Sequence, residues 1–318
     1  MSDILFIKTS SLGDVIHYMP ALSDARRYRP DARFAWVVEE AFVPLVQLHP
    51  AVAEVIPVAW RRWRAALHRA STWQEIGAFR HAMRARSDEV VIDAQGLVRS
   101  AVIAQMAHGR RHGYDRKSVR EQPAAWLYQV RHNVDRKQHA IARNRALTAM
   151  ALGYAYGGPP EYGLVRRRRA GTRYSVLLHA TARPEKQWPE QQWIHLGKIL
   201  ANLGGEVVLP SGNDEERARS ERIAAAIPRG RVLERQPLDV MTNVLGAASF
   251  VVGVDTGLLH LAAALGVPVV GIFVGSEPGL TGPVGAGPIA IVGTKAHPPT
   301  VDEVVRGVER VVGVWGSV

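Results

Sequence analysis

The chain has 318 residues, a formal net charge of +11 and no cysteine, which excludes disulfides, thiolate nucleophiles and zinc sites built on cysteine. Its 47% hydrophobic and 22% charged residues are typical of a folded globular protein long enough for two domains. The positive charge indicates an anionic partner, and composition alone leaves nucleic acid, an acidic membrane surface and a phosphorylated substrate open.

The first half of the chain alternates short apolar runs with helical patterns. Strands are expected at residues 4–8, 34–38, 55–58 and 90–93, and helices at residues 15–28, 98–107 and 140–152. This alternation predicts a parallel sheet with helices on both faces. The start of the chain lacks the pattern of a secretory signal, and the apolar stretch 258–275 is interrupted by His260, Pro268 and glycines. We therefore expect a cytoplasmic protein whose membrane contact is at most peripheral.

The loop 9–14, Thr-Ser-Ser-Leu-Gly-Asp, follows the first expected strand. Gly13 permits a sharp turn, and Asp14 comes at the start of the next helix. Two interpretations are open for this carboxylate. It caps the helix, or it serves as a general base, although a helix N-terminus stabilises the carboxylate and makes it a weaker base.

Basic residues concentrate in the first half, at 60–64 (Trp-Arg-Arg-Trp-Arg), at 108–112 (His-Gly-Arg-Arg-His), and at Arg116, Lys117 and Arg120. Arginine forks bind carboxylates and phosphates through two hydrogen bonds, whereas the alternative is a solvated basic face. His108 and His112 have the spacing of a metal pair on a helix, but Gly109 and the lack of nearby carboxylates argue against one.

The pattern is interrupted at residues 153–173, where Gly-Gly-Pro-Pro and four successive arginines show little periodicity. It resumes with expected strands at 174–179, 206–210, 250–254 and 267–273, and helices at 189–203, 214–226, 257–265 and 300–312. We predict an α/β protein with two Rossmann-like domains facing each other across a cleft, 1–155 and 173–318, joined by a linker at 156–172. Whether the last helix packs on the first domain is left open. Ligands of such sheets bind outside the carboxyl ends of the strands.

Two loops of the second half contain polar residues suited to a nucleotide. Thr181 and Lys186 follow the first strand of this half. Lys186 could reach a diphosphate as a mobile point charge. The simpler interpretation is a solvated surface lysine. Asp214, Glu215 and Glu216 could accept hydrogen bonds from ribose hydroxyls. Such an acidic run more often only occupies the first turn of a helix.

The segment 250–260, Phe-Val-Val-Gly-Val-Asp-Thr-Gly-Leu-Leu-His, leads from a buried strand directly into a helix. Free amides and the partial positive charge at that helix end suit a phosphate, with Thr256 adding a hydroxyl and Gly257 at the turn. His260 lies near the same helical face as Thr256. The alternative is that Asp255 caps the helix and His260 is a packed histidine. Aspartic proteases also contain Asp-Thr-Gly, but they need two copies in a β-rich fold.

Several well-known motifs are absent from the sequence. No G-x-G-x-x-G follows the first strand, which disfavours a nicotinamide-dependent oxidoreductase, and no P-loop, H-E-x-x-H or G-x-S-x-G occurs. There is also no Asp-x-Asp of the kind that holds a divalent ion on a sugar diphosphate. Protein charges alone would then have to neutralise a departing diphosphate.

Seven segments, in order over nearly the whole chain, resemble glycosyltransferase family 9: residues 7–15, 36–40, 61–64, 92–98, 179–181, 186–189 and 254–261. The pairing of Ser-Ser-Leu-Gly-Asp with Val-Asp-Thr-Gly resembles the family as a whole. The Arg-Arg-Trp-Arg and Asp-Ala-Gln-Gly segments favour those members that add the first heptose of the lipopolysaccharide inner core.

The resemblance implies an inverting, metal-independent enzyme of the GT-B fold that needs no cofactor. Its donor domain would be the C-terminal one and its acceptor domain the N-terminal one. The implied reaction transfers L-glycero-D-manno-heptose from ADP-heptose to the first Kdo (3-deoxy-D-manno-octulosonic acid) of Kdo2-lipid A, on the anionic cytoplasmic face of the inner membrane and without nucleic acid. Two alternatives stay open, a family 9 transferase that adds a later heptose and a non-enzymatic binder of anionic lipid or nucleic acid.

Matched residue by residue, the resemblance also implies roles for individual side chains. Asp14 is implied as the catalytic base. The implied donor site comprises Thr181, Lys186, Asp214, Glu216, Asp255, Thr256, Gly257 and His260. The implied acceptor site comprises Ser11, Gly13, Arg61, Arg62, Arg64 and Arg120, and no residue is implied as a metal ligand. The sequence departs from the family pattern in two places. Residue 182 is an alanine where relatives often have a second threonine. The loop after Gly212 is shorter, which leaves open which of Asp214, Glu215 and Glu216 meets the ribose.

Overall fold

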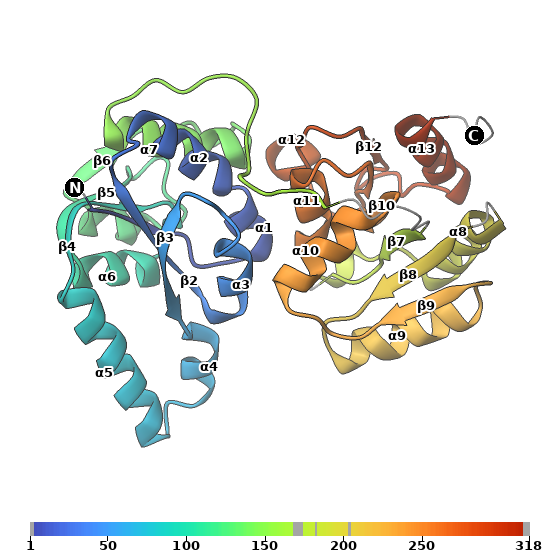
Figure 1. The fold of residues 1–318 in the computed structure, drawn as a ribbon, viewed down its shortest axis with the longest axis horizontal. Helices are drawn as coiled ribbons and strands as arrows, with labels where there is room; N and C mark the ends of the chain where they lie inside the picture. The colour runs from blue at the N-terminus through green and yellow to red at the C-terminus, as the bar shows by residue number, and fades with distance from the viewer. Residues whose placement is uncertain (1–2, 168–173, 182, 203–204, 314–318) are drawn as a thin grey trace. The chain divides into compact units, whose positions relative to one another are not determined.

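The computed structural model describes residues 3–167, 174–181, 183–202 and 205–313 (Figure 1). The chain divides into two compact units, Met1–Gly163 and Leu164–Val318. Each unit is built on one six-stranded parallel sheet. The unit boundary falls inside the segment expected as a linker, of which residues 168–172 lie outside the described part of the chain. Residue 182, where the expected second threonine is replaced, also lies outside it.

The first sheet has the strand order β3-β2-β1-β4-β5-β6. Its strands are β1 (Asp3–Ile7), β2 (Arg33–Glu39), β3 (Val52–Val58), β4 (Ser87–Asp93), β5 (His108–Tyr114) and β6 (Val130–His132). The helices of this unit are α1 (Leu12–Ile16), α2 (Met19–Tyr28), α3 (Val43–Val46), α4 (Trp60–Ala65), α5 (Ala70–Arg84), α6 (Val98–Met106) and α7 (Ala140–Leu152), with 3-10 turns η1 (Glu40–Phe42) and η2 (Gln122–Leu127).

The second sheet has the strand order β12-β11-β10-β7-β8-β9. Its strands are β7 (Tyr174–Leu178), β8 (Glu206–Pro210), β9 (Gly230–Leu233), β10 (Phe250–Val254), β11 (Val269–Ile272) and β12 (Ile289–Val292). Its helices are α8 (Glu190–Asn202), α9 (Asp214–Ala225), α10 (Leu238–Ala247), α11 (Gly257–Ala264), α12 (Pro278–Thr281) and α13 (Val301–Val312), with the 3-10 turn η3 (Pro184–Lys186). Both sheets therefore have the Rossmann order 3-2-1-4-5-6 when each is counted from its own first strand.

The central strands are the most deeply buried parts of both units. Residues 4–7 of β1 and all of β10 are buried, as expected for parallel strands covered by helices on both faces. In the second unit α13 packs against β10, β11 and β12, with Val304, Val308 and Val311 in the core. The last helix thus contributes to the core of its own unit. None of the described helices is long and apolar enough to span a bilayer.

One expectation about a helix is wrong. The helix expected at residues 15–28 is two helices, since Pro20 has no N–H to donate to the preceding turn and instead occupies the first turn of α2. Residues 108–112, where Gly109 and the lack of nearby carboxylates argued against a histidine pair on a helix, belong to the strand β5. Four residues along a strand span about 13 Å, so the His108 and His112 side chains cannot share a metal ion.

Candidate active site

Asp14 lies in the first turn of α1, directly after the carboxyl end of the central strand β1. Ser11, not Asp14, is the N-cap residue, which corrects the capping interpretation. Asp14 Oδ2 accepts hydrogen bonds from the Ser11 backbone N–H (2.8 Å) and from Ser11 Oγ (3.2 Å). Its side chain remains 31% exposed. The carboxylate is therefore held in one orientation while solvent or a ligand can still reach it.

A buried cation lies beneath Asp14. Lys8 Nζ is 4.0 Å from Asp14 Oδ1 and donates a hydrogen bond to the Ala94 carbonyl at 2.8 Å. Burial lowers the pKa of Lys8, while the negative charges of Asp14 and Asp93 act in the opposite direction. No role for Lys8 follows from the sequence alone, although Lys8 directly precedes the loop that contains Asp14.

The segment after β4 fixes the backbone of that loop. Gln95 Oε1 accepts hydrogen bonds from the backbone N–H groups of Thr9 (3.0 Å) and Ser10 (3.1 Å). The Gln95 backbone in turn donates to Asp93 Oδ1 at 2.9 Å. Because Asp93 and Gln95 are both buried, the loops that follow β1 and β4 form one rigid edge of the sheet. This is the physical role of the Asp-Ala-Gln-Gly segment.

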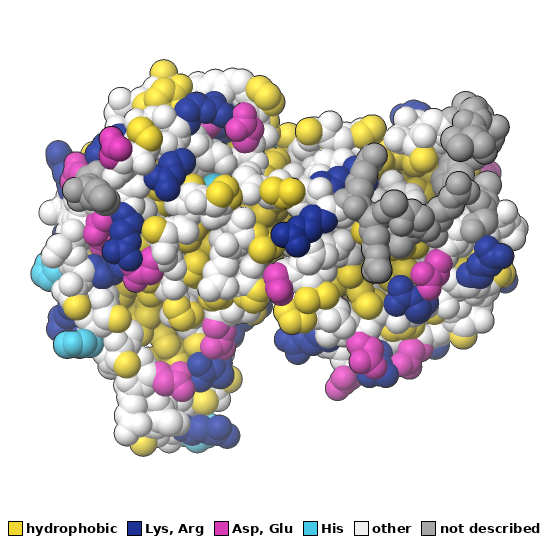
Figure 2. All heavy atoms as spheres, viewed as in Figure 1, with side chains coloured by type: hydrophobic (Ala, Val, Ile, Leu, Met, Phe, Trp, Pro, Cys, Tyr) yellow, Lys and Arg dark blue, Asp and Glu magenta, His cyan; other side chains and the backbone are white. Residues whose placement is uncertain are grey.

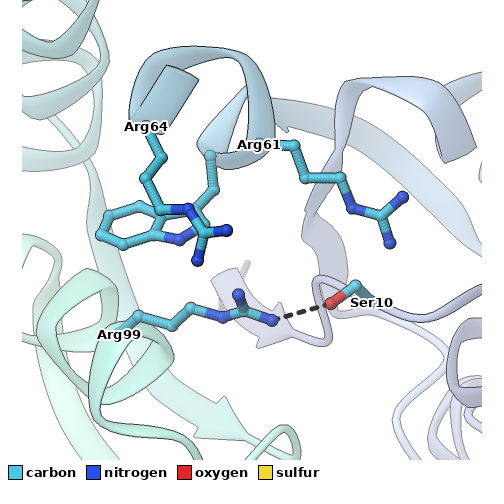
Figure 3. Close-up of a pocket in the computed structure, with 5 residues that line it drawn as sticks. Ser10, Arg61, Arg64 and Arg99 are labelled. Carbon is cyan, nitrogen blue, oxygen red and sulfur yellow. Dashed lines mark hydrogen bonds between the residues drawn. The ribbon is translucent and has the colours of Figure 1, made fainter. Parts of the chain in front are cut away.

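A pocket of about 400 Å³ opens at the same edge and is lined by Ser10, Trp60, Arg61, Arg64 and Arg99. Figure 3 shows the Arg64 and Arg99 side chains approaching one another from α4 and α6. Arg99 donates to Ser10 Oγ at 3.0 Å, while its Nε is buried and has no hydrogen-bond partner among the described residues. Three guanidinium groups around one cavity are suited to carboxylates or phosphates.

The other arginines expected at this site differ in their surroundings. Arg62 is held by two carboxylates, since it donates to both oxygens of Glu40 and forms a second ion pair with Glu75. Arg120 is exposed, and the backbone N–H of the next residue, Glu121, donates to the Gly96 carbonyl at 3.0 Å, which places Arg120 beside the loop after β4. Arg99 was not predicted as a site residue. It is the second residue of α6, the helix that follows β4, and ligands of parallel sheets bind at the carboxyl ends of the strands.

The second unit has its own polar cluster at the carboxyl end of β10, centred on Asp255. Asp255 Oδ2 accepts hydrogen bonds from Lys186 Nζ and Ser276 Oγ, both at 2.5 Å, and Oδ1 lies 3.2 Å from His260 Nε2. Burial acts to raise the pKa of Asp255, but the hydrogen bonds from His260, Lys186 and Ser276 outweigh it and hold that pKa well below its usual range. The N-cap of α11 is Thr256, so the alternative interpretation, in which Asp255 caps this helix, is wrong.

The start of α11 and the loop after β7 complete this cluster. The Thr256 side chain makes no capping hydrogen bond, and the helix begins at Gly257. Lys186 ends η3 in the loop that follows β7, the neighbour of β10 in the sheet. Thr181, in the same loop, is half-buried, and its Oγ1 accepts from the Arg183 N–H at 3.5 Å. An ammonium group beside a helix N-terminus is a favourable environment for a phosphate.

The acidic run 214–216 forms the first turn of α9, after β8. Asn213 caps this helix by accepting from the Glu216 N–H at 2.8 Å, and Glu216 Oε2 accepts from the Gly212 N–H at 2.8 Å. Asp214 and Glu215 are exposed. Throughout the described part of the chain, no group of three or more His, Asp or Glu side chains is arranged to hold a metal ion.

The known proteins that the chain resembles are heptosyltransferases. The family model described as glycosyltransferase family 9 (heptosyltransferase) matches residues 76–306. Lipopolysaccharide heptosyltransferase 1 from Escherichia coli (strain K12) is 43% identical over 291 residues, covering 89% of this chain and 91% of the relative. The protein of the same name from Pseudomonas aeruginosa PAO1 is 44% identical, with 89% and 81% of the two chains covered.

Solved structures agree with this result. The E. coli heptosyltransferase WaaC with ADP superposes with a TM-score of 0.90 at 39% identity, and WaaC with ADP-2-deoxy-2-fluoro heptose with 0.86 at 38%, each covering 96% of this chain and 99% of the other. E. coli ADP-heptose lps heptosyltransferase II, at 19% identity and a TM-score of 0.76 over 98% of both chains, shows the shared fold alone. The expected α/β fold of the GT-B class is confirmed.

Proposed function

The chain belongs to glycosyltransferase family 9, and from this premise we propose that it transfers L-glycero-D-manno-heptose from ADP-heptose to the first Kdo of Kdo2-lipid A. The observation that carries the proposal is the 43% identity to a lipopolysaccharide heptosyltransferase 1 over 89% of the chain. The E. coli (strain K12) lipopolysaccharide heptosyltransferase 2 is 35% identical over only 32% of the chain. This difference favours the first heptose over a later one.

The donor's diphosphate would bind at the polar cluster of the second unit. One N–H of the Lys186 ammonium is directed at Asp255, and its two remaining N–H groups are then available to phosphate oxygens. The helix start at Thr256 and Gly257, with Thr181 nearby, adds backbone and hydroxyl donors, and His260 supports Asp255. Solved relatives with ADP and with a fluorinated ADP-heptose support a donor of this chemical class.

The donor's ribose would bind at the start of α9. Glu216 uses one carboxylate oxygen to accept from the Gly212 backbone, so its second oxygen is the candidate acceptor for a ribose hydroxyl. Asp214 is exposed at the same helix end and is a second candidate. Carboxylate oxygens accept hydrogen bonds from hydroxyl groups and do not donate when ionised, which fits a sugar diol.

The acceptor's anionic groups would bind at the pocket of the first unit. Arg61, Arg64 and Arg99 surround a cavity of about 400 Å³, and arginine forks pair with carboxylates such as those of Kdo and with phosphates such as those of lipid A. Arg120 adds charge beside the loop after β4. Arg62, held by Glu40 and Glu75, would steady α4 rather than contact the acceptor.

We assign the base role to Asp14, in the loop whose shape Ser11 and Gly13 set. Asp14 takes the proton of the attacking Kdo hydroxyl while the new bond forms at the anomeric carbon, on the face opposite ADP. The bond from that carbon to the β-phosphate oxygen breaks, and its electron pair leaves with ADP, so that the configuration inverts. The transition state would have oxocarbenium character. Lys186 and the start of α11 would stabilise the growing phosphate charge without a metal ion.

The proposal is tested by ADP release from ADP-heptose with a panel of acceptors, with and without a chelator. We expect release that requires Kdo2-lipid A, persists in EDTA and gives a product of inverted anomeric configuration. Preference for an acceptor that already carries a heptose would assign a later step instead. Salt-sensitive DNA binding without any ADP release would favour the non-enzymatic alternative.

A further inference from the structure

The helices α4 and α5 form a hairpin that projects from the first sheet (Figure 1). Its inner side chains Trp63, Phe79 and Met83 are buried in the core of the unit. Leu67, in the turn between the two helices, is 47% exposed, and Trp73, in the first turn of α5, is 59% exposed. We call residues 67–73 the hairpin tip.

The exposed indole at the tip is held in place. Trp73 Nε1 donates a hydrogen bond to the Leu67 carbonyl at 2.8 Å, which fixes the ring beside the turn with much of its surface in solvent. Tryptophan concentrates at membrane–water interfaces because it combines a large apolar ring with one polar N–H. A leucine and a tryptophan side by side on a projecting turn are therefore suited to the interfacial region of a bilayer.

The charge of the hairpin favours an anionic surface. Residues 60–84 contain six arginines and a single acidic residue, Glu75, which is already paired with Arg62. The arginines are exposed, and Arg69 lies within the tip itself. Figure 2 shows a few hydrophobic and basic side chains on this projection, with acidic side chains beside some of the basic ones. Clustered arginines next to an exposed apolar element attract anionic lipid headgroups.

The hairpin also forms part of the pocket lined by Arg61, Arg64 and Arg99, which we call the arginine pocket. Arg61 and Arg64, which line the pocket, belong to α4, and Leu67 follows Arg64 by three residues. If the acceptor is a lipid, as the proposed function requires, its sugar must be reached while its acyl chains stay in a membrane. A hairpin that contacts the bilayer beside the pocket satisfies that requirement.

We propose that the hairpin tip docks on an anionic lipid bilayer, with Leu67 and Trp73 entering the interfacial region and Arg69 contacting lipid phosphates. This assignment goes beyond the proposed reaction because it names the surface that meets the membrane. Only its link to the arginine pocket rests on the proposed function. Docking itself requires neither donor nor acceptor.

The first experiment is co-sedimentation of the full chain with vesicles of phosphatidylcholine alone or mixed with phosphatidylglycerol, without substrate. We expect binding to the anionic vesicles only, and a several-fold loss of the bound fraction in Trp73→Ala and in Arg69→Glu. Trp126→Ala is the matched control, because Trp126 is 63% exposed and has Arg116 over its ring but lies on η2. Equal binding of Trp73→Ala and Trp126→Ala, or equal binding to both kinds of vesicle, would overturn the proposal.

The second experiment separates docking from catalysis. With Kdo2-lipid A embedded in anionic vesicles, Trp73→Ala should release ADP several-fold more slowly than the parent chain. With a deacylated, water-soluble form of the acceptor the two should agree within about twofold, which also shows that the variant is folded. An equal loss on both acceptors would contradict docking. If the parent chain transfers no heptose to either acceptor, the proposed function fails while the vesicle binding result still decides the docking proposal.

Discussion

Exchange of Asp14 for asparagine removes a proton acceptor while leaving the side-chain shape and one hydrogen-bonding oxygen in place. Asp14 Oδ2 accepts from the Ser11 backbone at 2.8 Å and from its hydroxyl at 3.2 Å, and an amide oxygen can accept both bonds. A capping interaction contributes about 1 kcal/mol, and the asparagine retains most of it. The variant should therefore fold with nearly the stability of the parent chain.

The effect on turnover should be much larger than the effect on folding. A positioned general base accelerates a reaction by roughly 10²–10⁴-fold, which corresponds to about 3–5 kcal/mol in the activation barrier. We expect kcat of Asp14→Asn to fall by that factor. Asp14→Ala should lose the same catalytic factor and, in addition, the hydrogen bonds to Ser11.

The assay combines three measurements on each variant: steady-state ADP release, ADP affinity by calorimetry, and thermal unfolding. ADP affinity should be unchanged, because the cluster of Lys186 and Asp255 belongs to the other unit. A kcat for Asp14→Asn within tenfold of the parent value, in a folded variant, would remove Asp14 from the base role.

Three further predictions concern stability and acceptor binding. Burial lowers the pKa of His49 to about 4, so below pH 6.5 the unfolded chain takes up a proton that the folded one excludes. The free energy of unfolding should fall by up to about 3 kcal/mol between pH 6.5 and 4 from this group, and His49→Asn should flatten that slope in urea titrations. Asp24→Ala leaves the buried Arg145 unpaired and should cost about 3–5 kcal/mol, whereas Glu221→Ala, which removes an exposed ion pair, should change little in the same titration. Arg99→Ala should raise the acceptor KM about tenfold to a hundredfold with an unchanged donor KM; an unchanged acceptor KM would exclude Arg99 from the pocket's function.

Most of the central strands were predictable from the sequence, whereas the strands β5, β6, β9 and β12 were not. The bounds of α7, β8 and β10 agree with the expected ones because their patterns are long or uniformly apolar. The strands β6, β9 and β12 have three or four residues each, too few for a periodicity to emerge. β5 contains His, Gly and Arg, and pairing with β4 overrides their weak preference for strands.

The location of the candidate site was predictable from the rule that ligands bind at the carboxyl ends of parallel strands. That rule singled out Asp14, Lys186 and Asp255 from local sequence. It could not reveal that Lys186 pairs with Asp255, 69 residues further along the chain, because that contact depends on how β7 and β10 pair. The hydrogen bonds from the loop after β1 to Gln95 could not be predicted for the same reason, because 85 residues separate Gln95 from Ser10.

The proposed mechanism adds one heptose to a Kdo-containing lipid and uses protein charges alone to stabilise the departing diphosphate. Its most direct test is mass spectrometry of Kdo2-lipid A after incubation with the purified protein and ADP-heptose in excess EDTA. We predict an acceptor that has gained a single heptose, with an equal amount of ADP formed. An unmodified acceptor in EDTA that becomes glycosylated only when a divalent metal is added back would contradict the claim.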